Sequence, residues 1–263
     1  MTNCIEEHGI DHLSASSINL YITNPCQWIV RYLYGVKWQG NPATARGTSV
    51  DNGIGYYLTS QSMKKPYTKE QCISKANQDY DKLIEHQKEN QDSVDNDKVR
   101  KEKDALPKYL ETAIDFYSEL MDPNKPFEYQ KEIELQIEGI KITGFLDLLC
   151  EGEGTVRDIK TVSRMPVSLP SSVKRQLSIY AMATDKTPIA DYVCVTKTKA
   201  EVKPIVVSDV DQYFEEVVRA CKSIKNLLSY SNDKQQIADL FYPDLDHWMW
   251  SDHEREVARK IWS

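Results

Sequence analysis

The segment GFLDLLCEGEGTVRDIKT, residues 144–161, decides the fold, because two apolar runs in it are each interrupted by charged residues. Both runs have the composition of β-strands, and the sequence EGEG separates them. A two-residue loop at Gly152-Glu153, with glycine first as a type II′ turn requires, would make the runs an antiparallel hairpin. In the register that this loop sets, Asp147 directly faces Asp158.

This pairing predicts a site that needs positive charge. Opposed residues of an antiparallel pair have Cβ atoms roughly 4.5–5.5 Å apart, and like charges there are destabilising. Lys160 lies on the same face as Asp158, but one lysine offsets only part of two carboxylates. A hard divalent cation, which takes oxygen ligands, fits the remainder. The alternative is a solvent-facing strand face with three charges, which four flanking apolar residues oppose: Phe145, Leu149, Val156 and Ile159.

Length and composition predict one globular domain. The chain has 263 residues, of which 40% are hydrophobic, enough for an ordinary core. Its 33 basic and 40 acidic residues give a net charge of −7, which excludes a nonspecific polyanion binder. Any nucleic-acid contact must therefore come from a local basic patch.

The sequence predicts a cytoplasmic protein without membrane contact. The N-terminus, MTNCIEEHGIDHL, lacks a basic start and an apolar region, and no stretch approaches the roughly 20 apolar residues that cross a bilayer. The six cysteines are scattered without a CxxC pair, so we expect neither a zinc site nor a dense disulfide framework.

Helices are expected in the first half of the chain. Ser14 or Ser16 can cap a helix that ends before Asn24-Pro25, and a second helix follows with Trp28, Tyr32 and Leu33. A third begins at Arg46-Gly47-Thr48, which places Asp51 near its N-terminus. Residues 62–121 are polar and helical in pattern, and we expect the charge-rich part, 86–104, to be a mobile and partly disordered connection.

The second half has the pattern of a sheet flanked by helices, an α/β or α+β core. Strands are expected at 127–139, 140–150, 155–161, 190–198 and 202–209, and helices at 171–184 and 210–230. In the first of these helices Gln176 and Tyr180 are four residues apart and share a face, directly after Lys174 and Arg175. An ordinary amphipathic helix would give the same spacing.

Four motifs follow one another along the chain in this order: Gly47-x-x-x-Asp51, Gly144-Phe-Leu-Asp147, Asp158-Ile-Lys160-Thr161 and Gln176-x-x-x-Tyr180. Together they resemble the RecB-family branch of the PD-(D/E)XK nuclease superfamily, in particular phage-encoded stand-alone exonucleases and CRISPR-associated relatives. The likeness extends from residue 14 to about 200. It implies a restriction-endonuclease-like core with a central mixed sheet, in a single nuclease domain over 1–263. Its parts would be a helical N-terminal part at 14–60, a polar helical insertion at about 62–121 and a catalytic core at about 126–230.

The resemblance also implies roles for the motif residues. Asp147 and Asp158 would bind Mg²⁺ or Mn²⁺ with the backbone carbonyl of Ile159. Lys160 would position or deprotonate the attacking water. Its role as a general base and its role as an electrostatic clamp are both compatible with the sequence. Gln176 and Tyr180 would orient the lysine or the DNA strand. A divalent ion suits this chemistry, because it lowers the pKa of bound water and stabilises charge on phosphoryl oxygens.

The chain departs from these relatives at two places. Many have a histidine metal ligand where Asp51 stands; aspartate is also a hard oxygen ligand, although it would equally stabilise a helix N-terminus by roughly 0.3–1 kcal/mol. Glu132, on the preceding strand, is a weaker candidate ligand.

Several relatives hold a [4Fe–4S] cluster with one early and three late cysteines. Cys26 stands at the early position, but no cysteine follows Cys221, so no iron–sulfur cluster is expected. Cys26 is then a core residue, and Trp248 and Trp250 would fill the cluster's place by apolar packing.

DNA contacts are expected from basic and polar residues near these motifs, each of which could also be a solvated surface residue. The candidates are Arg46, Thr161, Arg164, Lys174, Arg175, Lys197, Lys199 and Lys203. Four aromatic residues could stack on single-stranded bases, although helical spacing favours core packing for most: Tyr21, Trp28, Tyr32 and Tyr34.

The expected function is that of an Mg²⁺- or Mn²⁺-dependent deoxyribonuclease, an exonuclease that hydrolyses phosphodiester bonds at single- or double-stranded DNA ends. Recombination, repair or replication is its expected setting, in the host cytoplasm of a bacterium if the protein is phage-encoded. A single-strand-binding or recombination protein is a candidate partner, and ring-forming relatives allow a homo-oligomer. The alternatives are a structure-selective endonuclease, a non-catalytic DNA-binding accessory protein, and a metal-stabilised protein that acts on another substrate.

Overall fold

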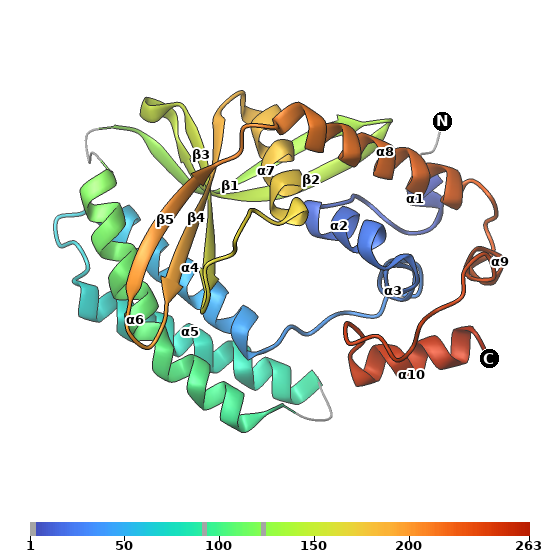
Figure 1. The fold of residues 1–263 in the computed structure, drawn as a ribbon, viewed down its shortest axis with the longest axis horizontal. Helices are drawn as coiled ribbons and strands as arrows, with labels where there is room; N and C mark the ends of the chain where they lie inside the picture. The colour runs from blue at the N-terminus through green and yellow to red at the C-terminus, as the bar shows by residue number, and fades with distance from the viewer. Residues whose placement is uncertain (1–3, 91–93, 122–124) are drawn as a thin grey trace.

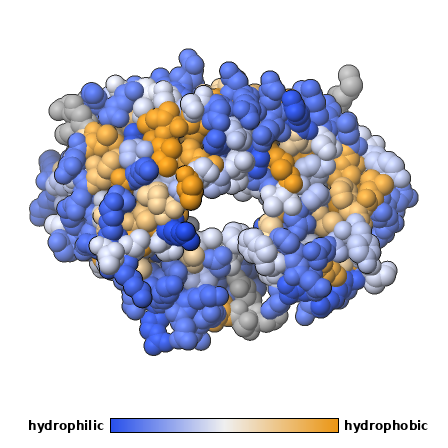
Figure 2. Space-filling view, in the orientation of Figure 1, coloured by the Kyte–Doolittle hydropathy of each residue, from blue (hydrophilic) through white to orange (hydrophobic). Residues whose placement is uncertain are grey.

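The computed structural model describes residues 4–90, 94–121 and 125–263. The chain forms a twisted sheet that is covered by helices on both faces (Figure 1). An opening passes through the middle of the molecule in the view of Figure 2. In Figure 1 the sheet and helix α4 lie on one side of this opening, α2, α3 and α10 lie on the other, and the segment 34–41 crosses below it.

The five-stranded sheet has the order β1-β2-β3-β4-β5 in the described residues. Its strands are β1 (Phe127–Ile137), β2 (Ile140–Cys150), β3 (Thr155–Val162), β4 (Thr187–Val195) and β5 (Ala200–Val206). Of these five strands, only β3 and β4 pair in parallel, because α7 (Ser171–Thr184) connects them as a crossover. The mixed sheet with flanking helices confirms the expected restriction-endonuclease-like α/β fold.

The remaining helices form two layers. Helices α4 (Pro42–Ser60), α5 (Lys69–Asn90) and α6 (Asn96–Leu120) pack on one face of the sheet with Leu148, Ile159 and Val193. The second core lies on the other face and is built by α7 and α8 (Val210–Leu228) together with the terminal segments. These are α1 (Cys4–Glu7), α2 (Ala15–Thr23), α3 (Pro25–Trp28), a π-helical turn at Ile29–Leu33, α9 (Lys234–Ala238) and α10 (Asp252–Ile261).

Two of the predicted helix boundaries are confirmed. Ser14 caps α2 in a reciprocal capping box with Ser17, and the helix ends at Thr23, before Asn24-Pro25. Within the described residues, no helix is both long and apolar enough to span a membrane.

Three predictions about local structure were wrong. Helix α4 begins at Pro42 rather than near Arg46, because Asn41 caps it and proline suits the first turn; Asp51 is therefore in the middle of the helix. The charge-rich stretch 86–104 is mostly helix, because it forms the end of α5, where buried Gln87 donates to the Asn41 carbonyl, and the start of α6, where Val99 packs against the core. The part of the expected connection at 91–93 lies outside the described residues.

The third correction concerns the hairpin between β2 and β3. The predicted pairing is present, with Leu148 opposite Arg157 and Cys150 opposite Thr155. The loop, however, has four residues instead of two: a 3₁₀ turn at Glu151–Glu153 followed by Gly154 at φ 66°. A left-handed glycine after a tight turn closes the hairpin as well as a type II′ turn does.

Strand β1 changes the face that its odd-numbered residues contact. Ile133 and Ile137 pack in the α7 and α8 core, whereas Phe127 and Tyr129 pack against the α4 to α6 core. The change occurs at Gln130, whose φ of 51° lies in the left-handed region that a long side chain rarely adopts. Such backbone strain is concentrated at functional sites, which directs attention to this point of the sheet.

Candidate active site

Strands β2 and β3 part at the predicted carboxylate pair. Their described backbone pairing ends at Leu148 and Arg157, one position before Asp147 would face Asp158. Instead, the N–H of Ile159 donates to Oδ2 of Asp147 at 2.7 Å. The side chain thus replaces a ladder hydrogen bond at the point where the backbone pairing of the two strands ends.

Asp158, Lys160, Gln176 and Tyr180 form one chain of polar contacts. Nζ of Lys160 lies 3.0 Å from Oδ1 and 2.7 Å from Oδ2 of Asp158, which is 1% exposed. The same Nζ donates to Oε1 of Gln176 at 3.2 Å, and Nε2 of Gln176 donates to the hydroxyl of Tyr180 at 2.8 Å. The structure therefore brings together the four residues that the β3 and α7 motifs supply.

Asp51 joins this cluster from the opposite layer. Its Oδ2 accepts hydrogen bonds from Gln130 Nε2 at 2.6 Å and from the Tyr129 hydroxyl at 3.1 Å. Gln130 Nε2 also lies 3.3 Å from Oδ1 of Asp147, so one amide links the two aspartates. The sequence reasoning missed Gln130 and Tyr129. The one signal in the sequence was their position on the strand that pairs with β2, where Tyr129 is opposite Leu148 and Lys131 is opposite Leu146, on either side of Asp147.

Burial and neighbouring carboxylates raise the pKa values of Asp147 and Asp51. Burial raises the pKa of Asp147 well above its ordinary value, and the charges of Asp158 and Asp51 add to this effect. Burial is also the main cause that raises the pKa of Asp51 to about 6. For Lys160 burial lowers the pKa, but the carboxylates of Asp158 and Asp147 outweigh it, and the net result is a raised pKa. The ammonium is therefore the favoured form next to free carboxylates.

The donor set of this cluster fits a hard divalent cation. Among contacts to described residues, the buried atom Asp51 Oδ1 accepts no hydrogen bond, whereas Asp158 Oδ2 has the Lys160 ammonium 2.7 Å away as its charged partner. A buried carboxylate oxygen without a partner is costly unless a cation or proton reaches it. The described residues nevertheless contain no preassembled group of three His, Cys, Asp or Glu side chains placed to hold a metal. Two carboxylates with a backbone carbonyl and water would suffice for Mg²⁺.

The strand residues next to the cluster are exposed. Glu132 pairs with Phe145 across β1 and β2, and both side chains face solvent. The other three apolar residues of the hairpin, Leu149, Val156 and Ile159, are buried as expected. The exposed ring of Phe145 instead belongs to the rim of a pocket.

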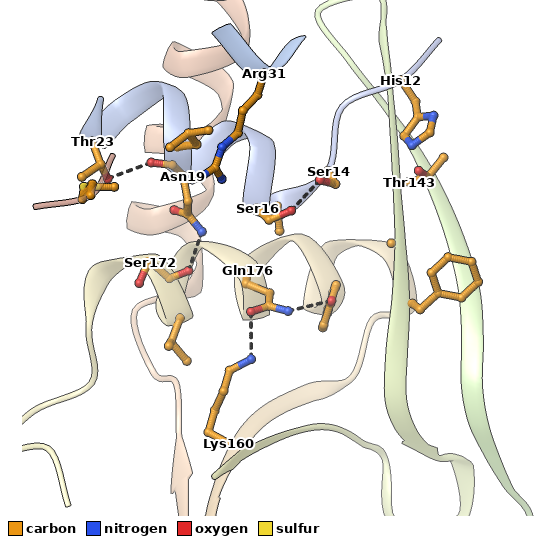
Figure 3. A pocket seen from close by; sticks show the side chains of 17 residues that line it. His12, Ser14, Ser16, Asn19, Thr23, Arg31, Thr143, Lys160, Ser172 and Gln176 are labelled. Atoms are coloured by element: carbon orange, nitrogen blue, oxygen red, sulfur yellow. Dashed lines mark hydrogen bonds between the residues drawn. The ribbon is translucent and has the colours of Figure 1, made fainter. Parts of the chain in front are cut away.

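That pocket, of about 630 Å³, lies between α2, α7 and β2 (Figure 3). Lys160 and Gln176 form its floor, and Ser14, Asn19 and Arg31 line the facing wall. Its volume is within the roughly 300–1,000 Å³ range of small-molecule sites. The chain of polar contacts is therefore open to a ligand from one side.

The basic candidates for DNA contact fall into two groups. Arg46 is buried against Tyr109, pairs with Glu102 and donates to the carbonyl of Thr161 at 3.2 Å. Lys174 and Arg175 are also paired, with Asp209 and with Asn19 and Glu216 respectively. The second group is exposed: Arg164 in the segment between β3 and α7, Lys197 and Lys199 between β4 and β5, and Lys203 on β5.

A buried ion pair supports the site from behind, and the sequence reasoning did not find it. Arg157 of β3 donates to both carboxylate oxygens of Asp191 of β4, at 2.7 and 2.9 Å. The hydroxyl of Tyr117 from α6 donates to Asp191 at 2.7 Å. All three side chains are buried, so this network fixes α6 to the two parallel strands.

The region where Trp248 and Trp250 were expected to fill the place of an iron–sulfur cluster is only partly apolar. Cys26 is buried in the core, and burial raises the pKa of its thiol to about 11. Trp250 is also buried, and its indole N–H donates to the carbonyl of Asp244 at 2.8 Å. Trp248, however, is 82% exposed, so it does not share the predicted packing role.

Three comparisons with known proteins bear on this site. The family model described as "PD-(D/E)XK nuclease superfamily" matches residues 12–244. No curated protein matches the sequence. Among solved structures, one titled "Crystal structure of SSO0001" aligns at 16% identity with a TM-score of 0.33, over 78% of this chain and 98% of that chain.

Proposed function

Because the chain belongs to the PD-(D/E)XK nuclease superfamily, we propose that it is an Mg²⁺- or Mn²⁺-dependent deoxyribonuclease that degrades DNA from its ends. The observation that carries the proposal is the single polar cluster of Asp147, Asp158, Lys160, Gln176 and Tyr180 beside an open pocket. A binding module has no need to hold two carboxylates together in a half-buried site at this energetic cost.

The residues suit the hydrolysis of a phosphodiester. Asp147, Asp158 and the Ile159 carbonyl would hold the divalent ion, with Asp51 as a further ligand. When bound, the ion would supply a water molecule of lowered pKa and charge stabilisation for the phosphate. The ammonium of Lys160, whose charged form the neighbouring carboxylates favour, would contact a phosphate oxygen. Gln176, fixed by Tyr180, orients that ammonium.

An exonuclease fits the architecture better than a restriction enzyme does. The described helices and strands all belong to the sheet and its two covering layers, so they include no separate recognition domain. The proposed contacts to the DNA backbone are the exposed Arg164 and Lys197, together with Lys199, which is exposed but also pairs with Glu201 at 2.6 Å. Recombination, repair or replication in a phage-infected bacterial cell is the proposed setting.

The test incubates linear single-stranded, linear double-stranded and closed circular DNA with Mg²⁺ or Mn²⁺. Wild type should degrade linear DNA only in the presence of metal, and Asp158→Asn and Lys160→Ala should lose at least about 100-fold in rate. Asp97→Asn and Lys222→Ala, on exposed helix surfaces, are the matched controls.

Other results would overturn parts of the proposal. Equal degradation by wild type and by both site variants would remove these residues from the chemistry. Cleavage of closed circles would identify an endonuclease, and no cleavage of any DNA would favour a non-catalytic DNA-binding protein.

A further inference from the structure

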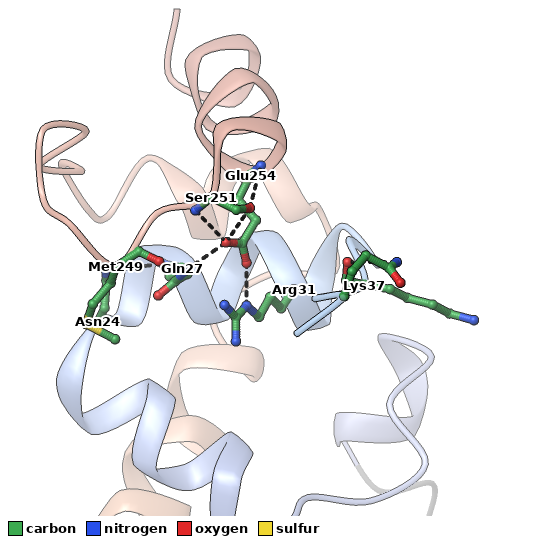
Figure 4. A network of polar contacts seen from close by, with 8 residues as sticks. Asn24, Gln27, Arg31, Lys37, Met249, Ser251 and Glu254 are labelled. Atoms are coloured by element: carbon green, nitrogen blue, oxygen red, sulfur yellow. Dashed lines mark hydrogen bonds and ion pairs between the residues drawn. The ribbon is translucent and has the colours of Figure 1, made fainter. Parts of the chain in front are cut away.

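Arg31 is held in a fixed orientation by the C-terminal helix α10. Its Nε donates to Oε1 of Glu254, a buried carboxylate (Figure 4). The other oxygen of Glu254 accepts from Gln27 Nε2 at 3.0 Å, and from the N–H and hydroxyl of Ser251 at 3.0 and 2.8 Å. With its partner carboxylate fully hydrogen-bonded, the guanidinium has little freedom to turn.

The free side of this guanidinium faces the candidate active site. Arg31 lines the same pocket as Lys160 and Gln176 and points into it from the opposite wall (Figure 3). Its two terminal nitrogens donate no hydrogen bond to any described residue, although Nε is engaged. A planar guanidinium with free terminal N–H groups is suited to phosphate, and fixing it in advance lowers the entropy cost of binding.

A second pocket, of about 460 Å³, is also lined by Arg31, and Lys160 is not among its lining residues. The two pockets share Ser16, Leu20 and Arg31, so they adjoin at these residues. Lys37 and Trp38 line the second pocket, and both are exposed. They belong to the segment 34–41 that crosses below the opening in Figures 1 and 2.

Trp38 has the properties of a stacking platform. The guanidinium of Arg31 lies over its ring, with the central carbon 5.3 Å from the ring centroid. The residue remains 47% exposed, so part of its ring is accessible to a ligand. Exposed aromatic rings beside arginine and lysine are the elements with which proteins bind single-stranded nucleic acid.

We infer that Trp38, Arg31 and Lys37 form a binding site for single-stranded DNA, with a nucleobase stacked on Trp38 and the adjoining phosphates on Arg31 and Lys37. The strand then continues past Arg31 and through the first pocket to Lys160. This inference rests on the proposed nuclease function and names its substrate as a single strand. A base that is paired in a duplex stays stacked on its neighbours and does not reach the ring.

The test measures binding of a fluorescent single-stranded oligonucleotide by anisotropy in EDTA, so that no cleavage occurs. Trp38→Ala should weaken binding about 5- to 150-fold, the loss expected for one stacked base, whereas Trp38→Phe should stay close to wild type. Lys37→Gln should reduce the slope of the logarithm of the binding constant against the logarithm of the salt concentration by about 1. Tyr242→Ala, which removes an aromatic ring that is 94% exposed, is the matched control and should bind like wild type.

A second measurement separates this site from the chemical centre. Hydrolysis of a small diester, bis(p-nitrophenyl) phosphate, with Mn²⁺ should be unchanged in Trp38→Ala, because the diester does not extend to the second pocket. Binding of a blunt duplex should also be insensitive to Trp38→Ala. Wild-type affinity of Trp38→Ala for the single strand, in folded protein by circular dichroism, would overturn the inference while the proposed function stands. If neither wild type nor Trp38→Ala hydrolyses the diester, but Trp38→Ala still weakens binding of the single strand, the proposed function fails and the inferred binding site stands.

Discussion

The backbone N–H of Ile159 donates to the carboxylate of Asp147 at the point where β2 and β3 would otherwise continue their ladder. Asp147 thus has two roles in the structure. Its oxygen ends the backbone pairing, and its charge contributes to the carboxylate cluster. The two roles can be separated, because asparagine retains an oxygen acceptor and loses only the charge.

Asp147→Asn should therefore abolish metal-dependent cleavage and leave the metal-free protein at least as stable as wild type, since one of the opposed charges is gone. Asp147→Ala should lose activity as well, and should be less stable than Asp147→Asn by about 1–3 kcal/mol, because the Ile159 N–H loses its acceptor. Urea unfolding in EDTA measures the difference. Equal stability of the two variants would contradict the structural role of the hydrogen bond.

The stability of the metal-free protein should depend on the protonation of Asp51. The fold raises the pKa of this carboxyl from 3.8 to about 6, so it favours the protonated form. The contribution of Asp51 to the free energy of unfolding is therefore highest at low pH and decreases by up to about 3 kcal/mol as the pH rises from about 4 to about 6. Asp147, whose pKa is also raised, acts in the same direction.

Melting temperatures in EDTA at pH 5 and pH 7.5 test this expectation. The decrease between the two values should be smaller in Asp51→Asn than in wild type, and Mg²⁺ should raise the melting temperature of wild type more at pH 7.5 than at pH 5, because protons compete for the same oxygens. Identical pH profiles of the two proteins in EDTA would show that Asp51 is not the titrating group.

Gly55 provides space for the ring that holds Asp51. A Cβ at this position would lie 2.3 Å from the ring of Tyr129, too close to be accommodated without movement. Gly55→Ala should displace Tyr129 and reduce cleavage by about 10-fold or more, although alanine improves helix propensity by about 1 kcal/mol. Gly47→Ala on the same helix is the control, because its added methyl comes no closer than 3.4 Å to the Thr161 hydroxyl. Activity of Gly55→Ala equal to that of the control would exclude the positioning role.

The buried network behind the site should be important for stability. Asp191→Ala removes the acceptor of both Arg157 and Tyr117 and leaves a buried guanidinium without a partner. Breaking such a pair costs about 3–5 kcal/mol. Chemical denaturation measures the loss, and Tyr117→Phe, which removes one hydrogen bond, should cost only about 1 kcal/mol. A loss below about 1 kcal/mol in Asp191→Ala would show that the pair does not stabilise the fold.

Sequence patterns alone predicted the sheet, the pairing of β2 with β3, and the shared faces of Asp158 with Lys160 and of Gln176 with Tyr180, whereas the link between Gln176 and Lys160 was expected only from the family resemblance. These features depend on short-range patterns: strand alternation, the spacing of charges within a hairpin, and residues four apart on a helix. The loop of the hairpin was mispredicted because two different turns close strands in the same register. The start of α4 was mispredicted because the signal of Asn41-Pro42 was not used.

Other parts of the site could not be predicted because they depend on contacts between distant segments. The positive φ of Gln130 breaks the alternation on which strand prediction relies, and its amide links two aspartates from different layers. Burial of Arg46 likewise depends on α6 covering it through Glu102 and Tyr109. Charge in a sequence does not distinguish a paired arginine from one that is free to meet a phosphate.

At Gln130 the odd-numbered residues of β1 change from contact with one core to contact with the other, and this affects how the molecule unfolds. Because β1 contributes Ile133 to one core and Tyr129 to the other, neither helical layer can detach without exposing part of the same strand. The two layers should therefore melt together, in one cooperative transition, although each has its own set of helices. Partial opening that frees the pocket by releasing an entire layer is not available to this chain.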